Sequence, residues 1–130
     1  MSDMEKVKGF LADLGLAVSS ENVAEELVVV DDESQGIKNL VIDCEAPILI
    51  LEQFILDLKK SDAAIYKRLL QINRGLVHGA FVLDDSGERL IFRDTLQLAN
   101  LDLNELEGSI NAISLAMAEH AYELIEFAAA

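Results

Sequence analysis

The sequence is poor in several residue types: its 130 residues include one cysteine, one proline, no tryptophan and only ten basic residues. The lone cysteine, Cys44, cannot form an internal disulfide and has no second thiol for a metal cluster, as is usual in a reducing compartment. The 24 acidic residues outweigh the ten basic ones, giving a formal charge of −14. Such a field repels phosphate backbones and anionic lipid headgroups, and we expect no nucleic acid and no membrane among the partners.

Aromatic residues and long apolar runs are also scarce. Five Phe and two Tyr lie scattered without basic neighbours, so they do not form a platform on which bases could stack. No uninterrupted apolar run reaches ~18 residues, and the N-terminus lacks the order of basic, apolar and small residues found in signal peptides. We therefore predict a cytoplasmic protein. Its length suits one domain with one core, which we place at residues 1–130.

The chain opens with the pattern of a helix start. The Ser2 hydroxyl and the Glu5 carboxylate can satisfy free backbone N–H groups as a capping box. Apolar residues then recur at helical spacing, and Gly15 suits the left-handed position that ends a helix. The stripe consists of Met4, Val7, Leu11 and Leu14.

Residues 16–58 have the composition of β-strands. Three runs rich in Val, Ile and Leu, separated by turn formers, predict a three-strand meander. Pro47 is expected at the start of the third strand, and the segment from there to Leu58 could alternatively be helical. The three runs are Leu27–Val30, Ile37–Ile42 and Ile48–Leu51.

A second helix and a hairpin follow. Ser61 or Asp62 can cap the helix, whose apolar stripe is Ile65, Leu69, Ile72 and Leu76. The chain then alternates as a hairpin around a turn at residues 84–87. We expect one face to be core and the other mostly solvated. The core face carries Phe81, Leu83, Leu90, Phe92, Leu96 and Leu98; the other face of the return strand carries Ile91, Arg93, Thr95 and Gln97.

The last expected element is a long helix that begins at Asp102, with Glu105 placed to complete a second capping box. A second line of small residues along this helix would let another backbone approach closely. The main apolar stripe is Leu103, Leu106, Ile110, Ile113, Met117, Ala121, Leu124 and Ala128, and the small residues include Ala112, Ala116 and Ala118.

The order of elements predicts the α+β class: helix, three-strand antiparallel meander, helix, two-strand hairpin and long C-terminal helix, with the helices packed on an antiparallel sheet. This order, with the sequence from Leu69 onward, resembles the type III secretion chaperone-like family, in particular its YbjN-type and Tir-chaperone-like members. The resemblance covers nearly the whole chain and is most specific from residue 69 to 125. The stretches that carry it are His78–Leu83, Asp84–Gly87, Arg89–Arg93 and Leu101–Leu106.

The resemblance implies a homodimer that binds an extended, unfolded segment of a client protein, without ATP and without chemistry. It brings no invariant functional residue to this chain. A regulatory or sensory domain of the YbjN type, acting by docking onto a protein, is the alternative, because many members of the family occur away from secretion systems. A small-molecule enzyme is the weakest reading.

Residues that could perform catalysis or hold a metal do not form a recognisable set. The acidic turns at residues 31–33 and 84–88 lack the spacing and the distal Glu of an EF-hand, and we interpret them as solvated turns. His78 and His120 have no matching metal ligand, and Cys44 lies between two acidic residues that disfavour its thiolate. Because no glycine-rich phosphate loop accompanies them, we predict that the protein is not an enzyme and binds no cofactor or metal.

The best candidate for partner binding is the run from residue 48 to 54, in which both parities of the expected strand are apolar. A strand edge there could accept a client segment by main-chain pairing, with pockets for alternate side chains. Burial of the same run inside the protomer or dimer is the alternative, and the sequence leaves both open. The residues of this predicted site are Ile48, Leu49, Ile50, Leu51 and Phe54.

Overall fold

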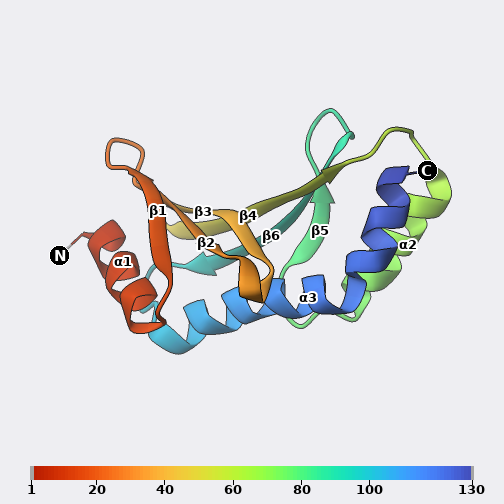
Figure 1. Cartoon of the computed structure of the whole chain (residues 1–130). Helices are drawn as coiled ribbons and strands as arrows, with labels where there is room; N and C mark the ends of the chain where they lie inside the picture. The colour runs from red at the N-terminus through yellow and green to blue at the C-terminus, as the bar shows by residue number, and fades with distance from the viewer. Residues whose placement is uncertain (1, 130) are drawn as a thin grey trace.

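The computed structural model describes residues 2–129 and contains one six-stranded antiparallel sheet with three α-helices (Figure 1). The strand order in the sheet is β1-β2-β3-β4-β6-β5, so β1 and β5 form its two edges. The long helix α3 runs beneath the sheet, with α1 at the β1 end and α2 at the β5 end. The elements are α1 (Asp3–Asp13), β1 (Ala17–Asn22), β2 (Leu27–Asp32), the 3-10 turn η1 (Glu33–Gln35), β3 (Ile37–Glu45), β4 (Ile48–Asp57), α2 (Ala63–Arg74), β5 (Ala80–Leu83), β6 (Arg89–Gln97) and α3 (Leu103–Ala129).

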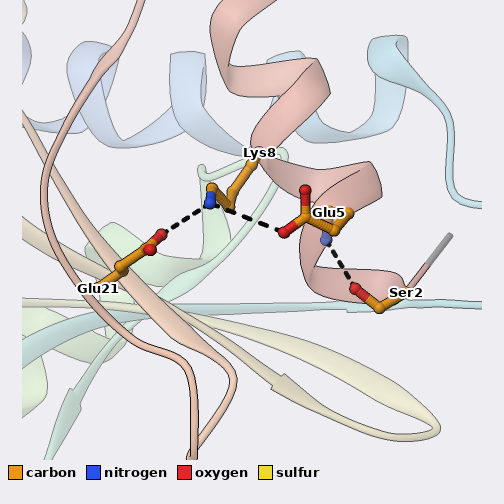
Figure 2. Close-up of polar contacts among 4 residues, drawn as sticks. All are labelled: Ser2, Glu5, Lys8 and Glu21. Atoms are coloured by element: carbon orange, nitrogen blue, oxygen red, sulfur yellow. Dashed lines mark hydrogen bonds and ion pairs between the residues drawn. The ribbon is translucent and has the colours of Figure 1, made fainter.

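Helix α1 begins as its sequence predicts. The Ser2 hydroxyl accepts a hydrogen bond from the Glu5 backbone N–H at 3.1 Å, and Gly15 has the left-handed φ of 74° just beyond the C-terminal end. Figure 2 shows that Lys8 reaches from α1 to β1, where its Nζ lies 2.8 Å from a Glu21 carboxylate oxygen and 3.8 Å from one of Glu5. The hydrogen bond to Glu21 raises the pKa of Lys8, and the ion pair links α1 to the edge strand.

Strand β1 was not predicted. All six of its residues are exposed, and its sequence, Ala-Val-Ser-Ser-Glu-Asn, has neither the alternation nor the apolar content of a half-buried strand. It forms because β2 offers an unpaired edge, and it pairs there antiparallel with a register shift between Val18 and Ser20. The meander therefore has four strands, β1 to β4, rather than the three that the sequence predicts.

The strand prediction for β4 is correct, and the helical alternative up to Leu58 is wrong. Strand β4 continues to Asp57 because β6 pairs with it along nearly its whole length, while β3 pairs with its first half, Ile48–Glu52. Pro47 lies in the turn immediately before β4, as expected. At the far end of β4, the buried amide of Gln53 donates to the Gly36 carbonyl and accepts from the Lys38 N–H, which fixes the β2–β3 connection.

Helix α3 begins at the predicted cap, where Asp102 Oδ1 accepts from the Glu105 N–H at 2.8 Å. Its first half crosses the sheet, and its second half turns upward to lie along α2 (Figure 1). The predicted apolar stripe holds through Met117 and again at Leu124, which is buried, but fails at Ala121, which is exposed. Beyond the point where α3 changes direction, His120 rather than Ala121 faces the core, and its ring centroid lies 6.5 Å from that of Phe81.

The core lies between the helices and the side chains of the strands that point toward them. Phe92 on β6 is completely buried and meets Phe81 on β5 edge to face, with ring centroids 5.3 Å apart. A buried polar contact joins α3 to the same strand, because the Ser109 hydroxyl donates to Asp94 at 2.7 Å. The predicted core face of the hairpin is confirmed at its centre, whereas Leu83 near the turn is 37% exposed.

We expect Phe92→Ala and Phe81→Ala each to lower the free energy of unfolding by about 3–5 kcal/mol, because each leaves a cavity beneath the helices. Urea denaturation measures this loss. Phe54→Ala is the matched control: Phe54 is 42% exposed on the opposite face, and its loss should cost under about 1.5 kcal/mol. A loss below about 1 kcal/mol at both core positions would contradict the assignment of the faces.

The second expectation concerns the thiol of Cys44, which lies in the core. Burial, assisted by the charges of Asp3 and Glu26, raises the pKa of this thiol to about 11. Alkylation by iodoacetamide at pH 8 should therefore be at least about 100-fold slower in the folded protein than in urea, since only the thiolate reacts. The single cysteine makes the readout unambiguous, and rates within about tenfold of each other would show that Cys44 is accessible.

Candidate functional site

One face of the sheet carries no helix within residues 2–129, and we call it the open face. Cross-strand pairing sets its rows: Leu27 of β2, Asp43 of β3, Ile50 of β4 and Thr95 of β6 are successive neighbours in one row. Apolar side chains dominate this face and remain partly accessible, whereas their neighbours of the other parity are buried. The apolar residues of the open face are Leu27, Val29, Val41, Ile48, Ile50, Phe54, Val82 and Ile91.

The five residues predicted for partner binding divide between the two faces. Leu49 and Leu51 are fully buried beneath the sheet and belong to the core. Ile48 and Ile50 are half-buried on the open face, and Phe54 is 42% exposed there. The two sets of alternate residues on this strand are both apolar, and they have different roles. One set packs on the helices, and the other lies on the open face.

The predicted strand edge at this run does not exist. Strand β4 is central, because β6 returns after α2 and pairs along the side of β4 that β3 leaves free. Main-chain pairing of a client with Ile48–Leu51 is therefore ruled out, since the backbone groups of that run already pair within the sheet. Local periodicity could not reveal this pairing, because the partners of Ile48–Leu51 on β6 lie 43 to 49 residues away in the sequence.

The two real edges of the sheet differ. At the β5 edge, the side-chain amide of Asn73 donates to the Phe81 carbonyl at 3.0 Å and accepts from the Phe81 N–H at 2.7 Å. The α2 side chain thus occupies the position that an added strand would take, which is one way in which proteins protect an edge. The β1 edge is exposed along its length and has no such side-chain plug among its hydrogen bonds within residues 2–129.

Acidic groups interrupt the apolar rows of the open face. Burial, followed by the charge of the neighbouring Glu45, raises the pKa of Asp43, and its Oδ1 accepts no hydrogen bond from residues 2–129. One row away, Glu52 lies 3.6 Å from the Arg93 guanidinium. Over the end of the face, the Arg89 guanidinium stacks 4.4 Å from the Phe54 ring centroid. The face is therefore apolar with a net acidic centre.

Sequence reasoning missed most residues of the open face. The prediction that the outward side of β6 is mostly solvated holds for Thr95 and Gln97, which are exposed, whereas Ile91 is half-buried beside Phe54 and Val82. The available signal was the second parity of β2 to β4, where Leu27, Val29 and Val41 repeat the apolar character of Ile50.

The polar residues singled out from the sequence occupy local structural positions. Asp32 accepts from Ser34 and Gln35 within its own turn, and Asp84 accepts from Ser86, which together with Arg89 lowers the pKa of Asp84. The predicted solvated turns agree with these contacts. His78 is exposed near Gly108 of α3, whereas Cys44 is buried in the core, and the described residues contain no group of three or more His, Cys, Asp or Glu side chains placed to hold a metal ion. Residues 2–129 contain no helix long and apolar enough to cross a membrane.

Comparisons with known proteins agree with this architecture. The chain is similar to YbjN of E. coli, described as a putative transcription regulator, with a TM-score of 0.71, 15% identity and 93% of each chain covered. It is also similar to the HopA1–SchA chaperone–effector complex, with a TM-score of 0.65 and 11% identity over 98% of this chain and 94% of that one. For the ExsC–ExsE complex the TM-score is 0.61 and the identity 18%, over 87% and 89%.

At such identities the solved structures establish a shared fold alone. No curated protein sequence matches the chain. The sequence profile of one protein family does match, and it covers residues 1–130 without a gap at either end. The chain belongs to the CesT_Tir_1 family, a type III chaperone family whose members are chaperone-type proteins rather than enzymes.

Proposed function

We propose that this protein is a small, acidic, cytoplasmic and dimeric chaperone-like protein that holds an extended segment of a client protein across the open face. The observation that carries the proposal is the set of partly accessible apolar side chains on the open face, among them Ile50 of the central strand β4, with no helix above this face in the described chain. Large exposed apolar patches on soluble domains are usually interaction sites. Membership of a chaperone-type family agrees with that interpretation.

An extended client segment suits this face physically. Alternate side chains of the segment would point down onto Ile48, Ile50 and Phe54, while its lateral N–H and C=O groups stay in contact with water. Burying apolar surface contributes about 25 cal/mol for each Å², so several client side chains together can offset the cost of ordering the segment. No nucleotide and no covalent step is needed for such binding.

The charges on the open face select among clients. Asp43 and Glu52 lie among the apolar residues of the open face in a chain whose net charge is −14; Arg93 pairs with Glu52, and Arg89 stacks on Phe54 at the end of the face. A segment that combines apolar residues with Lys or Arg would complement this field, whereas an acidic segment would be repelled. Client choice in this proposal therefore rests on two features, apolar spacing and positive charge.

A dimer would carry two such faces. Two linked binding surfaces make the second contact intramolecular, and this raises the overall affinity for a client long enough to span both. The chaperone–effector complex of the same fold supports a client-binding role, whereas the YbjN likeness is the reason to test folded partners as well.

The third expectation is that Ile50→Lys preserves folding but lowers client binding at least about tenfold. Lysine removes the apolar contact of Ile50 with the client. Its ammonium can pair with the neighbouring Asp43, whereas an acidic residue at this position would repel Asp43 and disturb the fold. The probe is a set of fluorescent peptides tiled across the products of the genes adjacent to this one, read by anisotropy. Apolar peptides that contain Lys or Arg are expected to bind the unchanged protein.

Val23→Lys is the control, since it makes the same change in charge at a side chain that is 69% exposed in the β1–β2 turn. Equal binding by the unchanged protein and by Ile50→Lys would exclude the open face as the binding surface. Binding of the folded gene products, with no binding of any unfolded peptide, would instead favour a docking regulator.

A further inference from the structure

Helix α3 is apolar on two opposite sides beyond its midpoint. Ile113, Ala116 and Leu124 are buried on the side that faces the core. On the opposite side Tyr122 is 89% exposed and Ile125 is 64% exposed, so large apolar side chains point into water there. A helix that packs on a core needs one apolar stripe, and a helix that is apolar on all sides is usually covered on all sides. The second stripe of α3 has nothing on it in the described chain.

The exposed stripe repeats with the spacing of a coiled-coil seam. Its members alternate steps of three and four residues, so they take the a and d positions of a heptad, the seven-residue repeat abcdefg. Its two alanines leave room for a second helix to approach closely. Glu119 and Glu126, both exposed, stand at the two e positions beside the seam. The members of the stripe are Leu115, Ala118, Tyr122, Ile125 and Ala129.

A cavity adjoins the start of the stripe. The loop between α2 and β5 and the middle of α3 enclose a hollow of about 220 Å³, whose wall includes Leu115 of the stripe and Glu119 beside it. Small residues of α3, Gly108 and Ala112, line the hollow and leave this space free. Val77 on its other side is 85% exposed. The cavity therefore extends the exposed stripe and offers room for one apolar side chain of a partner.

The charge beside the stripe has one sign. Residues 115–129 contain three glutamates and no Lys or Arg, and Glu123 is paired with Arg68 of α2 at 2.6 Å. Glu119 and Glu126 form no ion pair with a Lys or Arg within residues 2–129. Two like charges seven residues apart along a helix attract a row of the opposite sign with the same spacing. This side of α3 therefore favours a partner with Lys or Arg.

We propose that the exposed stripe of α3 binds one basic amphipathic helix of another protein, whose apolar residues pack on the a and d positions and whose Lys or Arg residues face Glu119 and Glu126. A helix suits this surface, because the backbone groups of α3 are paired within the helix and offer nothing to an added strand. The stripe is about 21 Å long at 1.5 Å per residue. Such a short contact gives weak and reversible binding. The proposal goes beyond client binding and uses none of the open face.

The same charges disfavour a second copy of this chain on the stripe. In an antiparallel pair of identical helices the e positions face each other, so Glu119 and Glu126 would meet glutamates. In a parallel pair e faces g, where this chain has Ser114 and Ala121, and no ion pair forms. A basic helix gains ion pairs in either orientation. Charge therefore selects a different protein as the partner.

The probe is a synthetic peptide of about 18 residues, long enough to cover the stripe, with Leu at its a and d positions and Lys at e and g. Repulsion between its own Lys residues keeps the peptide monomeric in solution. Binding to the unchanged protein is read by fluorescence anisotropy. A peptide with Glu in place of every Lys is the matched control, and it should bind at least about tenfold more weakly.

Tyr122→Ala/Ile125→Ala tests the apolar contacts of the stripe. Both side chains are exposed and alanine is the best helix former, so urea denaturation should show unchanged folding. Binding of the basic peptide should nevertheless fall at least about tenfold, because the two largest contacts on the seam are lost.

Glu119→Lys/Glu126→Lys tests the charges. This variant should lose the basic peptide at least about tenfold and gain the acidic one, since the signs on the two sides are exchanged. Gain of the acidic peptide also shows that the variant is folded. Glu33→Lys/Glu88→Lys is the control, because it makes the same change in net charge at exposed positions elsewhere, and it should bind both peptides like the unchanged protein.

Three results would overturn the proposal. Equal binding of the basic peptide by the unchanged protein and by Tyr122→Ala/Ile125→Ala would exclude the stripe. Binding that is lost in Ile50→Lys but kept in both α3 variants would place the peptide on the open face. Self-association in sedimentation velocity that Tyr122→Ala/Ile125→Ala abolishes would make a second copy the occupant. None of these results decides client binding, which the peptides from adjacent genes test separately.

Discussion

The packing of all helices on one side of a six-stranded sheet is the constraint on which the rest of this structure depends. Inward-facing side chains such as Leu49, Leu51 and Phe92 meet α3 and its neighbours and are fully buried. The opposite parity of the same strands has no layer above it in the described chain. Because the sequence places apolar residues on both parities of the central strands, the fold itself creates an accessible apolar surface.

Local features of the fold could be predicted from the sequence. The caps at Ser2, Asp62 and Asp102 form as expected, because a side-chain oxygen at a helix start needs only the backbone next to it. The pairing of Ala80–Leu83 with Leu90–Arg93 follows from two apolar segments joined by an Asp-Asp-Ser-Gly turn. In each case the interaction that decides the structure lies within about ten residues of the chain.

Features set by distant parts of the chain could not be predicted in the same way. Strand β1 exists only because β2 has an unpaired side, and its polar sequence gives no sign of this. The edge expected at Ile48–Leu51 is lost because β6 pairs there, although apolar residues on both parities correctly marked the strand as unusual. Ala121 leaves the core because α3 changes direction to follow α2, which moves His120 inward.

The most direct measurement of the central claim is methyl NMR of isoleucine-labelled protein during titration with a peptide that binds. The isoleucines sample three parts of the molecule: Ile48, Ile50 and Ile91 lie on the open face, Ile37, Ile42 and Ile113 in the core, and Ile125 on the exposed side of α3. Client binding across the open face should shift the first three signals and leave the core and Ile125 signals nearly unchanged. Shifts confined to Ile125, or to the core, with Ile50 unmoved would contradict the account.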